Sequence, residues 1–103
     1  FVNNVFQNGE VYGYFKKKNL VGAVGIEING KNAEISFLLV NSEFQGKGIG
    51  KKLMLLAEKK LKGVNEIYLY VLVKNKAVDF YKKLGYNIVD EKKNKCRMAK
   101  IIK

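Results

Sequence analysis

The chain has 103 residues, of which 48% are hydrophobic, so it can form one domain with a single core and is not a disordered tail. No apolar run approaches the ~20 residues of a membrane span, and one cysteine with no histidine argues against an internal disulfide, a metal site and a histidine triad. The formal net charge is +11, and nearly all of the basic residues are lysine.

The first forty residues predict an antiparallel meander of three strands. Val11 to Phe15 is rich in aromatic and branched side chains, which is typical of a strand. After a turn at Lys18-Asn19, a second strand runs from Leu20 to Ile28. The pair Asn29-Gly30 is a strong hairpin signal, and it joins this strand to a third one over Ala33 to Val40.

The middle of the chain predicts a strand-helix-strand unit. Apolar residues three and four apart indicate one face of a helix over residues 49–62, and Gly63 is expected to end it. Ile67 to Val73 is an unbroken apolar run, which is typical of a parallel strand covered on both faces. The unit is expected to be right-handed.

Three further elements complete the predicted fold. A shorter helix runs from Lys76 to Leu84 and stops at Gly85, and closing strands follow over Tyr86 to Val89 and Lys95 to Ile102. The expected class is therefore α/β, a mixed sheet in which an antiparallel meander precedes the order β-α-β-α-β-β. We expect residues 1–103 to form a single domain.

The stretch QGKGIG, Gln45 to Gly50, places three glycines directly before the predicted helix. It does not fit the P-loop pattern or the dinucleotide-binding pattern, because the required Gly and Ser/Thr positions hold other residues. Glycines let an anion approach the main chain, and a helix N-terminus presents unpaired N–H groups. The stretch therefore predicts a diphosphate site with Lys47, Lys51 and Lys52 around it. A turn that only changes the chain direction is the alternative.

Two blocks of the sequence carry a family resemblance. QGKGIG matches the Q/R-x-x-G-x-G/A signature of the GCN5-related N-acetyltransferases (GNAT family). NKAVDFYKKLGY, Asn75 to Tyr86, resembles that family's N-x-x-A-x-x-F-Y-x-x-x-G-F/Y block. The resemblance implies the GNAT fold and direct transfer of an acetyl group from acetyl-CoA, the co-substrate, to a primary amine of a small molecule or protein. The family's usual first strand and two helices look missing or short, because few residues precede Glu10.

The resemblance also implies the residues that bind acetyl-CoA. The diphosphate would lie on backbone N–H groups of Gln45, Gly46, Lys47, Gly48, Ile49, Gly50 and Lys51. The pantetheine arm would pair like an extra strand with the main chain of Leu38, Leu39 and Val40, where the two central parallel strands splay apart. Asn75 corresponds to a family residue that bonds the pantetheine. Its ordinary structural role is to cap the helix that follows, and both roles are compatible.

Two side chains are implied in the chemistry. Tyr81 corresponds to the family's tyrosine that protonates the departing thiolate. A phenol of reference pKa ~10 is a weaker acid than a thiol near 8.5, so hydrogen-bond donation is expected rather than full proton transfer. Glu34 matches the glutamate that the histone-acetylating branch uses as a base. Glu27 is the reserve base, and a chain of waters is the alternative to a fixed base. Glu34 could instead be an ordinary exposed strand residue, and Tyr81 an ordinary core aromatic.

The charge leaves other functions open. A basic nucleic-acid-binding module is one alternative, although the lysines are spread in pairs and most aromatics fall in apolar runs typical of a core. A non-catalytic acetyl-CoA-binding domain or fragment is another. We expect an amine acceptor as partner and a cytoplasmic location, and a homodimer is one possible oligomeric state. We expect no metal, no membrane association and no nucleic-acid partner. Cys96 is expected to be a small buried hydrophobe.

Overall fold

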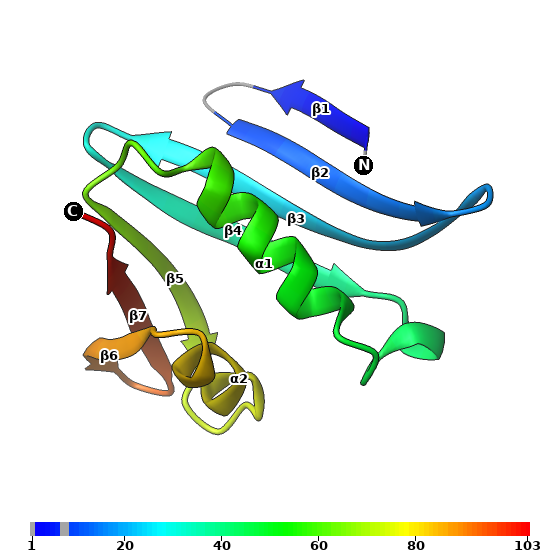
Figure 1. Ribbon diagram of the computed structural model, residues 1–103. Coiled ribbons are helices and arrows are strands. Elements are labelled where there is room, and N and C mark those ends of the chain that lie inside the picture. Colours follow the sequence, from blue (N-terminus) through cyan, green and yellow to red (C-terminus); the bar gives the residue numbers. More distant parts are fainter. Residues whose placement is uncertain (1, 7–8) are drawn as a thin grey trace.

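The computed structural model describes residues 2–6 and 9–103, which form one mixed sheet with two helices against it (Figure 1). Seven strands in these two ranges lie in the order β1-β2-β3-β4-β5-β7-β6. The strands are β1 (Val2–Phe6), β2 (Gly9–Lys16), β3 (Asn19–Asn29), β4 (Asn32–Val40), β5 (Glu66–Leu72), β6 (Asn87–Lys92) and β7 (Lys95–Ile101). The helices are α1 (Ile49–Lys60) and α2 (Ala77–Lys83), and the 3-10 turn η1 (Ser42–Phe44) follows β4.

The predicted class and element order are confirmed. The first residues, whose structure the sequence left ambiguous, contribute strand β1, which pairs with β2 in antiparallel fashion. Phe1, Gln7 and Asn8 lie outside the described residues. The turn between β2 and β3 falls one residue earlier than predicted, because Lys17 adopts a left-handed conformation with φ of 59°. The expected hairpin between β3 and β4 forms, but Asn29 pairs with Asn32, so its two loop residues are Gly30 and Lys31, with a φ of 64° at Gly30.

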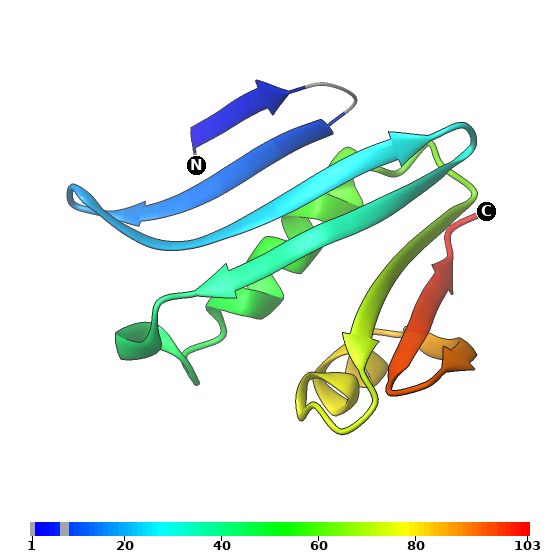
Figure 2. The ribbon, with the colours of Figure 1, turned by 180° about the vertical axis from the view of Figure 1, so that it is seen from behind.

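Helix α1 covers one face of the sheet, and the opposite face carries no helix in the part of the chain that the structure describes (Figure 2). Its buried side chains Ile49, Leu53, Met54 and Ala57 belong to the hydrophobic core. The helix ends before the predicted Gly63. The Leu61 N–H donates to the carbonyls of both Ala57 and Glu58, which tightens the last turn and places Leu61 in the core.

The two central parallel strands stay together over only three residue pairs. β4 and β5 pair from Asn32 with Glu66 to Glu34 with Tyr68, and beyond Glu34 this edge of β4 has no strand partner among the described residues. On its other edge, β4 bulges at Ser36 where it pairs with β3. The expected divergence of the central strands is therefore observed, and it leaves a stretch of β4 backbone available for pairing.

The second helix is closed by a left-handed glycine. Gly85 has a φ of 99°, its N–H donates to the Lys82 carbonyl, and the Tyr86 N–H donates to the Tyr81 carbonyl at 3.1 Å. These two hydrogen bonds form a Schellman motif, so Gly85 ends α2 as predicted. Cys96 on β7 is fully buried, and burial raises the pKa of its thiol, which agrees with a packing role.

Candidate active site

The glycine-rich loop leads into α1 with a row of unpaired donors. Within the described ranges, the backbone N–H groups of residues 46–51 donate no hydrogen bond, and the first helical bond runs from the Lys52 N–H to the Gly48 carbonyl at 3.1 Å. Gly48 is the N-cap and supplies no side chain to the helix end. These N–H groups and the positive end of the helix dipole form a site for a negatively charged group.

Glycine is required at two positions of this loop. Gly46 and Gly48 both have φ of 80°, a conformation that side chains disfavour, and a Cβ on either would point into open space. The space that a side chain would occupy is thus left beside the free N–H groups. A diphosphate fits this arrangement, because it needs close approach to several backbone donors at once.

The strand end and the loop are fastened to each other. The Gln45 side chain donates to the Val40 carbonyl at 3.2 Å, and the Asn41 side chain accepts from the Glu43 N–H at 3.1 Å. Lys47 lies over the Phe44 ring, with its Nζ 5.5 Å from the ring centroid. These contacts hold the loop at the end of β4, directly beside the unpaired edge.

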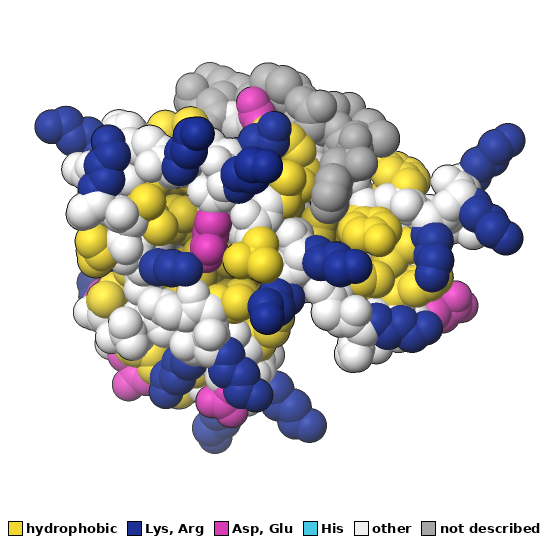
Figure 3. Space-filling view, viewed as in Figure 1, with side chains coloured by type: hydrophobic (Ala, Val, Ile, Leu, Met, Phe, Trp, Pro, Cys, Tyr) yellow, Lys and Arg dark blue, Asp and Glu magenta, His cyan; other side chains and the backbone are white. Residues whose placement is uncertain are grey.

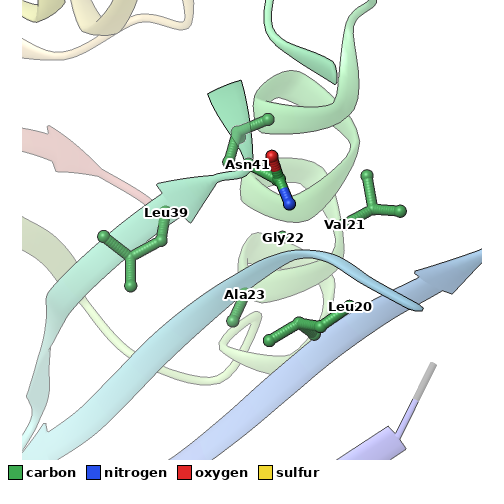
Figure 4. A pocket seen from close by; sticks show the side chains of 7 residues that line it. Leu20, Val21, Gly22, Ala23, Leu39 and Asn41 are labelled. Atoms are coloured by element: carbon green, nitrogen blue, oxygen red, sulfur yellow. The ribbon is translucent and has the colours of Figure 1, made fainter. Parts of the chain in front are cut away.

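The β4 segment predicted for the pantetheine arm borders an apolar depression. Its walls come from the start of β3 and the end of β4, and its volume is about 240 Å³ (Figure 4). Leu39, which is 61% exposed, and Val40 line it, and Leu38 and Val40 also pack against the core. The end of β4 therefore offers both an open backbone edge and an apolar surface.

Asn75 acts as a helix cap in the structure. Its side-chain oxygen accepts from the Ala77 N–H at 2.8 Å, at the start of α2. Its amide nitrogen donates no hydrogen bond within the described residues, so the same side chain keeps a donor for a ligand.

Tyr81 lies on the core side of α2. The residue is 7% exposed, and its ring contacts those of Phe80 and Tyr86 edge-on, at centroid distances of 5.1 and 6.0 Å. Burial raises the pKa of the Tyr81 phenol, so it stays protonated at neutral pH. Its hydroxyl has no hydrogen-bond partner in the described chain, yet it is not a fully buried atom. The hydroxyl is thus a free donor.

Glu34 and Glu27 face each other across β4 and β3. They form a directly opposite pair in the antiparallel register. Partial burial raises the pKa of the Glu34 carboxyl, the Glu27 charge raises it further, and the charges of Lys95 and Arg97 oppose this. Because Ala33 and Ile35 on either side are buried, Glu34 points to the helix-free face, opposite Tyr81. The structure thus places the two candidate catalytic side chains on opposite faces of the sheet.

Sequence reasoning missed the surroundings of Glu34. Tyr68 is its partner on β5, and the Tyr68 hydroxyl accepts from the Asn29 side chain at 2.7 Å. Arg97 lies over the Tyr68 ring at 4.4 Å and pairs with Glu66 at 2.7 Å. Tyrosines at every second position of β5, Tyr68 and Tyr70, could have indicated that both lie on one face of the sheet, but the cross-strand neighbours depend on register.

The loop and α2 meet beside the divergence of the strands. A Cβ on Gly50 would be 3.4 Å from the Phe80 ring, and Phe80 adjoins Tyr81. The space-filling view shows a notch between α2 and the loop that follows β4 (Figure 3). The contact between Gly50 and Phe80 therefore places α2 next to the start of α1, the helix that follows the loop.

The basic side chains do not form one patch on the face that carries α1. Lys and Arg side chains are spread over the described part of that face (Figure 3). Among the described residues, no helix is long and apolar enough to cross a membrane, and no cluster of acidic, histidine or cysteine side chains could hold a metal ion.

A family model described as the acetyltransferase (GNAT) family matches residues 3–86. A spermidine N(1)-acetyltransferase from Thermoplasma acidophilum is 38% identical over 81 residues, which are 76% of this chain and 50% of that protein. The chain thus spans about half the length of this curated relative.

Solved structures share the fold. The PaiA N-acetyltransferase from Thermoplasma acidophilum, in complex with coenzyme A, superimposes with a TM-score of 0.86 and 33% identity over 91% of this chain and 61% of its own. The ribosomal-protein-S18-alanine N-acetyltransferase from Escherichia coli has a TM-score of 0.87 and 18% identity over 95% of this chain and 72% of its own. The second similarity concerns the fold alone.

Proposed function

The chain belongs to the acetyltransferase (GNAT) family, and from this premise we propose that it transfers the acetyl group of acetyl-CoA to a primary amine. The observation that carries the proposal is the row of free N–H groups at residues 46–51, beside the unpaired edge of β4. We further propose that residues 1–103 act as one acetyl-CoA-binding domain in the cytoplasm.

The proposed binding residues each have a physical task. The free N–H groups of residues 46–51 hold the diphosphate, with the charges of Lys47 and Lys51 nearby. The Gln45 N–H, which the sequence also assigned to this task, already donates to the Ser42 carbonyl at 3.5 Å. The main chain of Leu38 to Val40 pairs with the amides of the pantetheine arm. Asn75 donates to the same arm through its free amide nitrogen while its oxygen caps α2.

The proposed catalytic residues remove a proton from the amine and donate hydrogen bonds to the atoms that gain negative charge. Acetyl-CoA supplies a thioester carbonyl that a neutral amine can attack. Glu34 takes the proton of the amine, directly or through water, because an amine of reference pKa ~10.4 is mostly charged at neutral pH. Tyr81 donates a hydrogen bond to the sulfur as negative charge develops on it. The main chain near Leu38 donates to the carbonyl oxygen.

A polyamine is the acceptor that we propose to test first. The curated relative is a spermidine acetyltransferase, and the Glu27–Glu34 pair offers negative charge on the helix-free face, which suits a substrate with several amines. Spermidine is therefore the probe in the activity tests below.

We expect acetyl-CoA at 100 times its Kd to stabilise the domain by ~2.7 kcal/mol, which raises the midpoint of thermal unfolding by roughly 10 °C for this size. The measurement is a thermal scan with and without acetyl-CoA. Release of CoA thiol with spermidine present then measures turnover.

Three outcomes of that experiment separate the possible functions. A shift with turnover supports the enzyme, and a shift without turnover for any amine tested indicates a non-catalytic acetyl-CoA-binding domain. No shift at millimolar acetyl-CoA contradicts the proposal. A nucleic-acid-binding module would instead bind DNA or RNA with an affinity that falls steeply as salt increases.

The acid side of the pH–rate profile is expected to depend on the charges around Glu34. Glu34 accepts a proton only when ionised, so the rate rises with pH through its pKa, which lies above the usual 4.5. Glu27→Gln removes a like charge and shifts this limb to lower pH, whereas Lys95→Gln removes an opposite charge and shifts it to higher pH. The measurement is kcat/KM for one acceptor across pH.

The Glu34→Gln variant provides the direct test of the base. It is expected to lower the rate while the thermal shift with acetyl-CoA stays unchanged, because the carboxyl does not contact the phosphate loop. An unchanged rate at neutral pH would remove Glu34 from the mechanism. Shifts of the same sign for Glu27→Gln and Lys95→Gln would show that the limb reports another group.

A further inference from the structure

We propose that Tyr86 is a positioning residue for Tyr81, and that its hydrogen bond to Glu58 fixes where the Tyr81 hydroxyl lies. This inference rests on the proposed function, in which Tyr81 serves the departing sulfur. It begins from the observation that the Tyr81 hydroxyl has no hydrogen-bond partner among the described residues. Its position therefore depends on how the end of α2 is held.

A partly buried hydrogen bond ties Tyr86, which follows Gly85 at the end of α2, to α1. Tyr86 is fully buried, and its hydroxyl donates to Glu58 Oε2 at 2.8 Å. The other carboxylate oxygen, Oε1, pairs with Lys100 Nζ at 3.1 Å, and the Glu58 side chain is 14% exposed. Lys100 on β7 offsets the carboxylate charge, so the three side chains connect α1, α2 and the sheet.

The position of Tyr86 is transmitted to Tyr81 through both backbone and ring. The Tyr86 N–H donates to the Tyr81 carbonyl in the Schellman motif, and the two rings meet edge-on with centroids 6.0 Å apart. α2 has only seven residues, which is too short for a helix to hold its own geometry. A displacement of Tyr86 would therefore move the Tyr81 ring.

A second contact joins α2 to the other end of α1. Near the start of α1, Gly50 lies against Phe80 of α2, while Glu58 lies near the end of the same helix. α1 also begins with the phosphate loop. The Glu58–Tyr86 bond thus sets the distance between Tyr81 and the loop that holds the cofactor. Neither Glu58 nor Tyr86 is proposed to touch the cofactor.

The test is a double-mutant cycle measured with acetyl-CoA and spermidine. Tyr86→Phe keeps the ring and removes the hydroxyl, and we expect kcat to fall about fivefold to tenfold while KM for acetyl-CoA stays within about twofold. In a Tyr81→Phe background the same change is expected to lower kcat no further. A purely structural role would lower kcat in both backgrounds.

Two further variants complete the design. Glu58→Gln keeps an oxygen that can accept from Tyr86 and is expected to retain most of kcat, whereas Glu58→Ala should reproduce Tyr86→Phe. Tyr12→Phe, at a buried tyrosine on β2 remote from α2, is the control for loss of a core hydroxyl and should leave kcat unchanged.

The failures can be told apart. A wild-type domain that turns over, with Tyr86→Phe equally fast or with additive losses in the double variant, overturns this inference alone. If Tyr86→Phe does not fold, wild-type kcat in Glu58→Ala overturns it instead. A wild-type domain without turnover of any amine overturns the proposed function and this inference together.

Discussion

The Gly48→Val variant is expected to lose the stabilisation that acetyl-CoA gives to the wild-type domain, ~2.7 kcal/mol at 100 times the Kd. A side chain at this position would extend into the open space beside the free N–H groups, where the diphosphate is proposed to bind. Its bulk would keep the phosphates from the backbone donors. The measurement is the thermal midpoint of each variant with and without acetyl-CoA.

Gly30→Val is the matched control for backbone strain. Gly30 has a φ of 64° against 80° for Gly48, and a Cβ there also meets nothing within 4 Å. A β-branched residue at either site carries a similar cost of about 1–2 kcal/mol in the unliganded protein. Gly30 lies at the far end of β4, so its variant should keep the full acetyl-CoA shift. A full shift in Gly48→Val would contradict the proposed binding mode of the loop.

The second large effect is expected for Tyr81→Phe, which should lower kcat at least about tenfold with little change in the KM for acetyl-CoA. The loss should fall on kcat because the hydroxyl is proposed to interact with sulfur mainly as the carbon–sulfur bond breaks. Steady-state release of CoA with spermidine as acceptor measures both constants.

The pH dependence gives an independent check on Tyr81. A phenol donates its hydrogen bond only while protonated, and burial raises the pKa of Tyr81 above its usual 10.0. The wild-type rate should therefore not fall from Tyr81 ionisation between neutral pH and pH 9. Tyr12→Phe serves as the core control again. Equal kcat for wild type and Tyr81→Phe would leave Tyr81 as a packing residue only.

Most of the fold follows from local sequence signals. The hairpin after β3 is specified by Gly30, which takes the left-handed conformation of its turn, and the apolar spacing after Gly48 specifies α1. The errors are at element ends and in the expectation that the run from Ile67 to Val73 is covered on both faces, because Tyr70 and Leu72 are exposed. The turn at Lys17 and the end of α1 at Lys60 depend on which backbone groups find partners, and the residue types alone do not decide this.

The candidate site could be predicted where its chemistry lies in consecutive residues. The loop proposed to bind the diphosphate is such a segment, because its backbone donors and glycines follow one another along the chain. The surroundings of Glu34 could not be predicted in this way. Tyr68 and Glu27 are its neighbours through strand register, and a shift of one residue would turn each side chain to the other face.

The sequence by itself determined the family, the order of the elements and the loop from Gln45 to Lys51, since these depend on spacing within short segments. Only the tertiary structure decided that β4 and β5 part after Glu34, that Glu34 and Tyr81 lie on opposite faces, and that Tyr86 reaches Glu58. These features join residues far apart in the chain. They are fixed by packing and strand pairing, which local propensity does not specify.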